Sequence, residues 1–155
     1  MTIGPSFGGL GEPDDGWAAL GVGAPTVIGL ARLCSRALSG DTPQMERLSN
    51  EARAILYVAR RRGALEVKGS YDAFEAPLRF LTVHVEVEPG QQVRFRSATD
   101  PVQAVRFLEG FRQLCAAGMV LHHLYHEFSL SESGFARAQQ VQLEEVQTML
   151  NFVEE

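Results

Sequence analysis

The sequence lacks several features that would define its class at once. None of its apolar runs approaches the ~18 residues of a membrane-spanning helix, so we expect no membrane insertion. Its first ten residues, MTIGPSFGGL, lack the positively charged start and apolar core of a secretory signal. The two cysteines, Cys34 and Cys115, lie in apolar helical patterns, which favours reduced core thiols over a disulfide. Together these absences predict a cytoplasmic protein.

Catalytic signatures are also missing. The sequence has no G-x-S-x-G nucleophile motif, and neither cysteine lies in a local pattern that would activate a thiol. The glycine-rich start does not end in the G-K-[ST] of a phosphate-binding loop. Paired carboxylates occur only on expected helix surfaces or in the acidic C-terminal part. The sequence therefore favours a non-enzymatic role, and we expect no cofactor.

What the chain does contain is typical of one soluble domain. Of its 155 residues, 45% are hydrophobic and 21% are charged. The formal net charge of −5 is uneven, because residues 53–96 hold eight basic and five acidic side chains whereas residues 97–155 hold three and eight. The basic middle is either an ordinary mixed surface or a patch for an acidic partner.

Residues 1–25 contain seven glycines and three prolines, which predicts a flexible arm before a single domain at residues 26–155. Four apolar side chains interrupt this arm. They either fold back on the domain or dock on a partner protein. The four candidate partner-binding residues are Phe7, Leu10, Trp17 and Leu20.

Apolar periodicity predicts a helix over residues 26–38 and a second helix from Pro43, capped by Thr42 or interrupted by a new start at Ser49. The second helix ends in Arg60, Arg61 and Arg62. These three cations either stabilise the negative end of the helix dipole, which we prefer, or contact phosphates of a nucleic acid.

Three shorter elements are expected next. Residues 64–68 predict a strand, and residues 71–76 a helical turn ended by Pro77. Residues 81–88 and 93–96 alternate as a β-hairpin does. A three-residue loop would pair Val87 with Val93 and Glu86 with Arg94, which keeps the apolar side chains on one face.

The chain is organised around residues 101–139. Pro101 begins a helix that ends before Gly118, residues 119–130 form a short hairpin, and Ser131 caps a helix over residues 132–153. That last helix either packs on its own domain, which we prefer, or forms a homodimer with a second copy.

The order of helix, short hairpin and helix, with its L-S-E-S-G turn at Leu130, Ser131 and Gly134, resembles the back half of a winged-helix domain. The resemblance covers about forty residues. It implies a two-stranded wing after a helix, and a DNA-binding transcriptional regulator, dimeric through residues 132–153, as one candidate function. The hairpin at residues 81–96 departs from the pattern, because a winged helix would run there from one helix into the next.

DNA binding would use a defined set of side chains. On the expected outward side of the helix at residues 101–117, glutamine and arginine suit base recognition, while an arginine cluster suits phosphates. The candidate nucleic-acid residues are Gln103, Arg106 and Gln113, together with Arg60, Arg61 and Arg62. The wing itself carries no lysine or arginine, which weakens this interpretation.

A zinc site is a minor alternative. If residues 115–126 were helical, His122 and His126 would share a face with Cys115. The expected hairpin separates them instead, so we expect no metal site. The sequence as a whole predicts a single α+β domain, winged-helix-like in its C-terminal half. Its leading function is that of a non-enzymatic adaptor or regulatory module that binds another protein.

Overall fold

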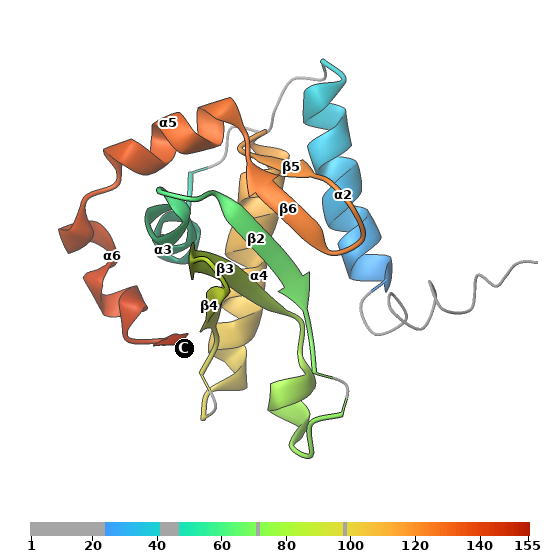
Figure 1. Cartoon of the computed structure of the whole chain (residues 1–155), viewed down its shortest axis with the longest axis vertical. Coiled ribbons are helices and arrows are strands. Elements are labelled where there is room, and N and C mark those ends of the chain that lie inside the picture. The colour runs from blue at the N-terminus through green and yellow to red at the C-terminus, as the bar shows by residue number, and fades with distance from the viewer. Residues whose placement is uncertain (1–23, 41–46, 71, 98) are drawn as a thin grey trace, which may run out of the picture.

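Helices and short strands are mixed along the chain in a computed structural model that describes residues 24–40, 47–70, 72–97 and 99–155 (Figure 1). The helices are α2 (Ala24–Leu38), α3 (Asn50–Ala59), the 3₁₀ turn η1 (Ala76–Arg79), α4 (Pro101–Ala116), α5 (Glu132–Gln140) and α6 (Leu143–Leu150). The strands are β2 (Ala64–Lys68), β3 (Thr82–Glu88), β4 (Gln91–Phe95), β5 (Val120–His122), β6 (Glu127–Leu130) and β7 (Val153–Glu154). This is the predicted α+β class.

The six strands form one antiparallel sheet in the order β5-β6-β2-β3-β4-β7. Alternation along each strand gives the sheet one buried and one polar face, as is common for antiparallel sheets. In β2, for example, Leu65 and Val67 are buried, whereas Glu66 and Lys68 lie on the polar face. The polar face turns toward the viewer in Figure 1, and α4 passes behind the sheet.

The core lies between the buried sheet face and the helices. Phe107 and Phe111 of α4 are fully buried, and their rings contact Phe95 of β4 and Phe128 of β6. Helix α3 packs against α4, α5 and α6, while α2 packs against α4 and β5. Within the described ranges, no helix combines the length and apolarity needed to cross a membrane.

Helix α3 begins at the later of the two expected starts. The Ser49 side chain caps it by accepting a hydrogen bond from the Ala52 N–H at 3.1 Å. Residues 47–49 are not helical, so the expectation of one continuous helix from Pro43 is wrong there, while Thr42 and Pro43 lie outside the described residues. A serine whose oxygen satisfies a free N–H competes with helix continuation.

The β3–β4 hairpin forms, but its predicted register is wrong. Val85, not Val87, lies opposite Val93, and a β-bulge falls between Glu86 and Glu88. The extra residue of the bulge lets a two-residue Pro–Gly turn keep the apolar side chains on one face. Glu86 pairs with Arg62 of the preceding loop instead of Arg94.

The expected helix over residues 132–153 is broken, which corrects that prediction. Val141 and Gln142 are extended, and Gln142 with Glu145 forms a capping box that starts α6 anew. The buried Val146 of α6 then packs on α3, and Val153 joins the sheet beside Phe95. Residues 132–153 therefore pack on their own domain, as preferred, and the homodimer remains a prediction.

The turn after β2 also differs from expectation. The helical turn spans Ala76–Arg79 and contains Pro77 in its first turn, rather than ending before it. Proline is compatible with that position because a helix leaves its first N–H groups unpaired in any case.

Candidate functional site

A groove runs between α2 and α4 on the outside of the domain. Its volume is about 460 Å³. Both helices contribute apolar side chains to it, and Gly29 leaves room because nothing lies within 4 Å of the position its Cβ would take. The lining residues are Thr26, Gly29, Leu30, Leu33, Val105, Leu108, Glu109 and Arg112.

Helix α4 exposes two apolar side chains at the groove, of which Val105 lines it. Val102 is 53% exposed and Val105 55% exposed, one helical turn apart. Glu109 and Arg112 form a two-pronged ion pair at the rim, with nitrogen–oxygen distances of 2.7–3.0 Å. The charged groups of this rim neutralise each other, so the groove floor offers mainly apolar contact.

Toward the C-terminal end of both helices, α2 and α4 bring two cysteines together. Cys34 of α2 and Cys115 of α4 are free, buried thiols. Burial raises the pKa of the Cys115 thiol well above its usual value, and the neighbouring Cys34 raises it further. Both cysteines lie in the core, as expected, and their reduced state remains a prediction.

The opposite side of α4 packs on α3, which corrects the prediction that Gln103 and Gln113 face outward. The buried Gln103 donates from Nε2 to Glu51 Oε2 at 3.1 Å. Gln113 Oε1 accepts from the Ser49 N–H at 2.9 Å. Arg106 is exposed, as expected. The two glutamines thus hold α3 and α4 together, and are not on a surface that reads bases.

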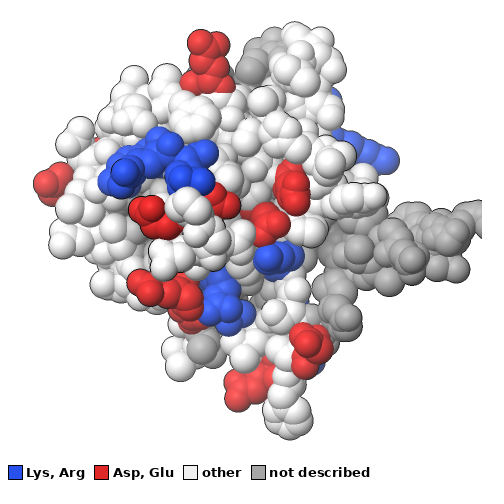
Figure 2. All heavy atoms as spheres, viewed as in Figure 1, with Lys and Arg blue, Asp and Glu red and all other residues white. Residues whose placement is uncertain are grey.

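Two of the three arginines after α3, Arg60 and Arg62, contact other groups of the domain. Arg60 donates to the Tyr57 carbonyl at 2.6 Å and lies over the Tyr57 ring. Arg62 forms an ion pair with Glu86 at 2.8 Å. Figure 2 shows basic and acidic side chains interspersed on this face of the molecule. The helix-end role expected for Arg60 is confirmed by its bond to a carbonyl of the last turn.

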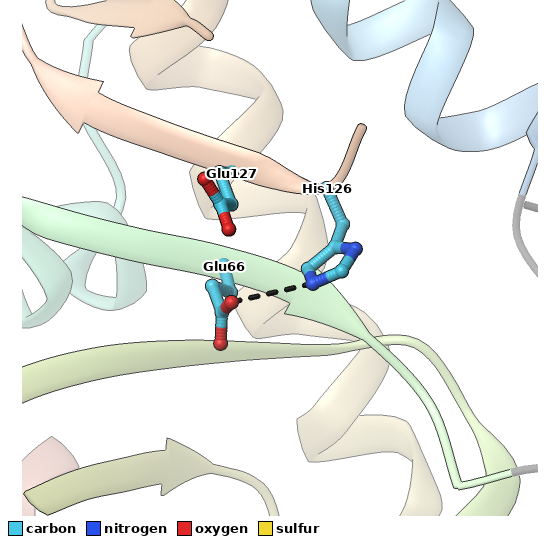
Figure 3. Close-up of side chains that lie close together, drawn as sticks. All are labelled: Glu66, His126 and Glu127. Atoms are coloured by element: carbon cyan, nitrogen blue, oxygen red, sulfur yellow. Dashed lines mark ion pairs between the residues drawn. The ribbon is translucent and has the colours of Figure 1, made fainter. Parts of the chain in front are cut away.

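The polar sheet face holds a cluster of ligand-type side chains, formed by Glu66, His126 and Glu127 (Figure 3). One ligand atom of each lies within 4.8 Å of the others, and His126 Nε2 lies 3.2 Å from Glu66 Oε2. The predicted alternative set is not brought together. Cys115 is in the core, while His122 bonds the Tyr125 carbonyl in the β5–β6 turn at 2.7 Å.

Two neighbouring donors lie within hydrogen-bond distance of the Glu66 carboxylate. Gln92 Nε2 and Lys68 Nζ lie 2.7 and 2.8 Å from its Oε1. Burial acts to raise the pKa of Glu66, but these hydrogen bonds and the charges of Lys68 and His126 hold that pKa below its usual value. Because an ammonium group already occupies the carboxylate, the cluster is better explained as an ion-pair network than as a metal centre.

His84 lies on the same face, with its Nδ1 3.0 Å from the Thr82 carbonyl. Burial lowers the pKa of His84 to about 4 despite that bond, so the imidazole is neutral at physiological pH. The neutral His84 therefore adds no positive charge to this face, whereas contacts with the phosphates of a nucleic acid would need positive charge.

The sequence predicted the two helices that carry Leu30 and Leu108, but not the surface that Leu33, Val102 and Val105 form. The candidate partner-binding residues of the arm, Phe7, Leu10, Trp17 and Leu20, lie outside the described residues. Comparisons with known protein families, with curated proteins and with solved structures found no match to this chain.

Proposed function

We propose that this chain is a non-enzymatic adaptor or regulatory module that binds another protein, and that the α2–α4 groove is its docking surface. The single observation that carries the proposal is the pair of half-exposed valines, Val102 and Val105, beside an apolar groove of about 460 Å³. Contiguous exposed apolar surface of this kind typically marks an interaction site.

The chemistry of the groove suits a short amphipathic helix of the partner. Leu30 and Leu33 form one wall, and Val105 and Leu108 the other, each pair on adjacent turns. Such walls accept apolar side chains spaced three or four residues apart. The neutralised rim pair of Glu109 and Arg112 leaves no strong charge requirement.

Selection from a library of random peptides displayed on phage tests this proposal with the full chain as bait. We expect enrichment of peptides whose apolar residues recur at three- and four-residue spacing. Val105→Glu should abolish their binding, because it places a carboxylate on the apolar wall. Leu38→Glu is the matched control, because Leu38 is 76% exposed on α2 and does not line the groove. Equal binding by both variants would refute the groove as the site.

A winged-helix DNA-binding regulator is the second candidate. The order of α4, the β5–β6 hairpin and α5 supports it, as does the Ser131 cap, whose Oγ accepts from the Gly134 N–H at 3.1 Å. The involvement of Gln103 and Gln113 in helix packing counts against it.

Fluorescence anisotropy against a mixed-sequence DNA duplex, from low to physiological salt, separates the two candidates. Under the adaptor proposal no binding is expected even at low salt. Steeply salt-dependent binding that falls in an Arg60→Ala/Arg61→Ala/Arg62→Ala variant would favour the regulator instead, because released counterions make phosphate contacts salt-sensitive.

A further inference from the structure

Two thiols meet between the C-terminal parts of α2 and α4. Leu30, four residues before Cys34, and Leu108, seven residues before Cys115, both line the groove between these helices. Positions four or seven residues apart share one face of a helix, so both cysteines lie on the facing sides of α2 and α4. Both are free, and a hydrogen bond joins their side chains. The two sulfur atoms are therefore neighbours, although their helices are far apart in the sequence.

The two thiols differ in their access to a second cavity. This cavity, of about 310 Å³, lies between the C-terminal ends of α2 and α4, strand β5 and the start of α5. Cys34 lines it, whereas Cys115 does not and is fully buried. Because Cys34 is only 3% exposed, a reagent that reaches its sulfur must be little larger than water. Hydrogen peroxide meets that condition.

A neighbouring pair with one sulfur at a cavity suits oxidation in two steps. In the first, the Cys34 thiolate attacks one oxygen of hydrogen peroxide, which breaks the O–O bond, releases hydroxide and leaves a sulfenic acid on Cys34. In the second, the Cys115 sulfur attacks the Cys34 sulfur and displaces its hydroxyl group, which leaves as water with the proton of the Cys115 thiol. Two thiols and one peroxide thus become one disulfide and two waters, and the peroxide gains two electrons.

The surroundings of Cys115 suit it to the second step and not the first. Burial raises the pKa of the Cys115 thiol, so little of it is the thiolate that attacks peroxide. Its contact with Cys34 offsets this in the second step, because neighbouring groups held in one folded chain react at a high effective concentration.

We infer that Cys34 and Cys115 form a peroxide-responsive modification site, in which Cys34 reacts first and Cys115 converts its sulfenic acid into an intrachain disulfide. The bond joins α2 to α4 beyond the groove and fixes α2 on the domain. In a reducing compartment both cysteines return to thiols. The modification requires no partner in the groove, so it is independent of the proposed function.

Peptide mapping of the full chain by mass spectrometry tests the site. Dilute protein is treated with hydrogen peroxide at neutral pH, unfolded, alkylated at its remaining thiols and digested. We expect two peptides linked through Cys34 and Cys115 that dithiothreitol separates, which distinguishes the link from sulfoxide at the methionines. Thiols that stay reduced, sulfinic acid at Cys34 without the link, or a disulfide between two chains would each overturn the inference.

Two matched variants test the order of the steps. Cys115→Ala lacks the second thiol and should accumulate sulfenic and sulfinic acid at Cys34. Cys34→Ala should oxidise at Cys115 about tenfold more slowly, because Cys115 does not line the cavity. Equal rates would mean oxidation through the unfolded chain, and would overturn the assigned roles. Thermal unfolding checks that both variants are folded, and the link in the unsubstituted chain decides in either case.

The bond should also raise the melting temperature by about 5 °C or more, because it closes a long loop of the unfolded chain. Peroxide-treated Cys34→Ala is the control for methionine oxidation and should show no such rise. An unchanged or lower melting temperature of the linked chain would contradict the fixing of α2 on the domain.

Discussion

The two sides of α4 show how differently one helix can be packed. Toward α3 the contact is close and polar at its ends, with Gln103 bonded to Glu51 and Gln113 to Ser49. At Gly110 the backbones approach so closely that an added Cβ would lie 2.7 Å from the Ala52 nitrogen. Toward α2 the helices diverge into a groove, and Val105 remains half exposed.

This difference separates the part of α4 that builds the fold from the part left free to bind. A buried polar side chain needs its partner, and a close backbone contact accepts no added atoms, so substitutions toward α3 affect stability. An exposed valine is packed on one side only, so substitutions toward α2 affect recognition first. Substitutions on the two sides of α4 should therefore differ in what they change.

The largest expected effect is on the α3 side. Gly110→Ala should lower the unfolding free energy by about 2 kcal/mol, because the added Cβ meets backbone of α3 that cannot rotate away. Chemical denaturation measures this change. Gly29→Ala on α2 is the control, expected to stabilise by about 0.5–1 kcal/mol because alanine favours a helix and the site is open. Similar changes in both variants would show that the two sides are packed alike.

The next largest expected change in stability is that of Gln113→Ala. Gln113→Ala should destabilise the protein by about 1 kcal/mol, because the Ser49 N–H loses its acceptor at the start of α3. Arg106→Ala, on the exposed surface of the same helix, should change stability by less than about 0.5 kcal/mol. A larger loss of stability for Arg106→Ala than for Gln113→Ala in thermal unfolding would contradict the structural role of Gln113.

The reactivity of the two cysteines tests how stably the C-terminal end of α2 packs on α4. Native Cys34 and Cys115 should be alkylated by iodoacetamide at pH 8 much more slowly than in the unfolded chain. Both are buried, and the raised pKa of Cys115 reduces its thiolate at that pH. Mass spectrometry follows the reaction. Alkylation as fast as in denaturant would mean that α2 leaves α4 readily, and that the groove is not a stable surface.

The smallest effect on stability belongs to the groove itself. Val105→Glu should change the unfolding free energy by less than about 0.5 kcal/mol, because the side chain is 55% exposed. A large loss of stability would show that Val105 contributes to the folded core. A loss of peptide binding by Val105→Glu could then result from unfolding, and would not identify the groove as the binding site.

Much of the fold could be predicted where local signals agree. Helix α4, the β5–β6 hairpin, α2 and β2 follow from apolar periodicity with proline, serine and glycine at their ends. At Gly118, for example, φ is +75°, a conformation that glycine readily adopts at the end of a helix.

The predictions that were wrong concern segments whose residues are compatible with two local structures. Val141 continues the helical pattern, yet Gln142 and Glu145 start a new helix because α6 must turn back onto α3. In the β3–β4 hairpin the bulge after Glu86 is invisible to a face-matching argument, because it restores the alternation that a tight turn would otherwise break.

The candidate site was less accessible from sequence for a different reason. Gln103 and Gln113 are polar, and a helix with polar residues on one side is normally predicted to expose that side to solvent. Whether such a side meets water or another helix depends on where α2 and α3 pack, which is a long-range property. The groove belongs to no single segment, because its walls come from residues about 75 positions apart along the chain.

The central position of α3 bears on the order in which the molecule assembles. Its buried face is completed by α4, α5 and α6, and the last of these begins at Leu143, whereas α3 ends at Ala59. Contacts so distant in sequence form slowly, because a long loop must close before they contribute. During synthesis the apolar face of α3 therefore emerges before its partner helices, and the part that contacts α6 stays uncovered until residues 143–150 are made.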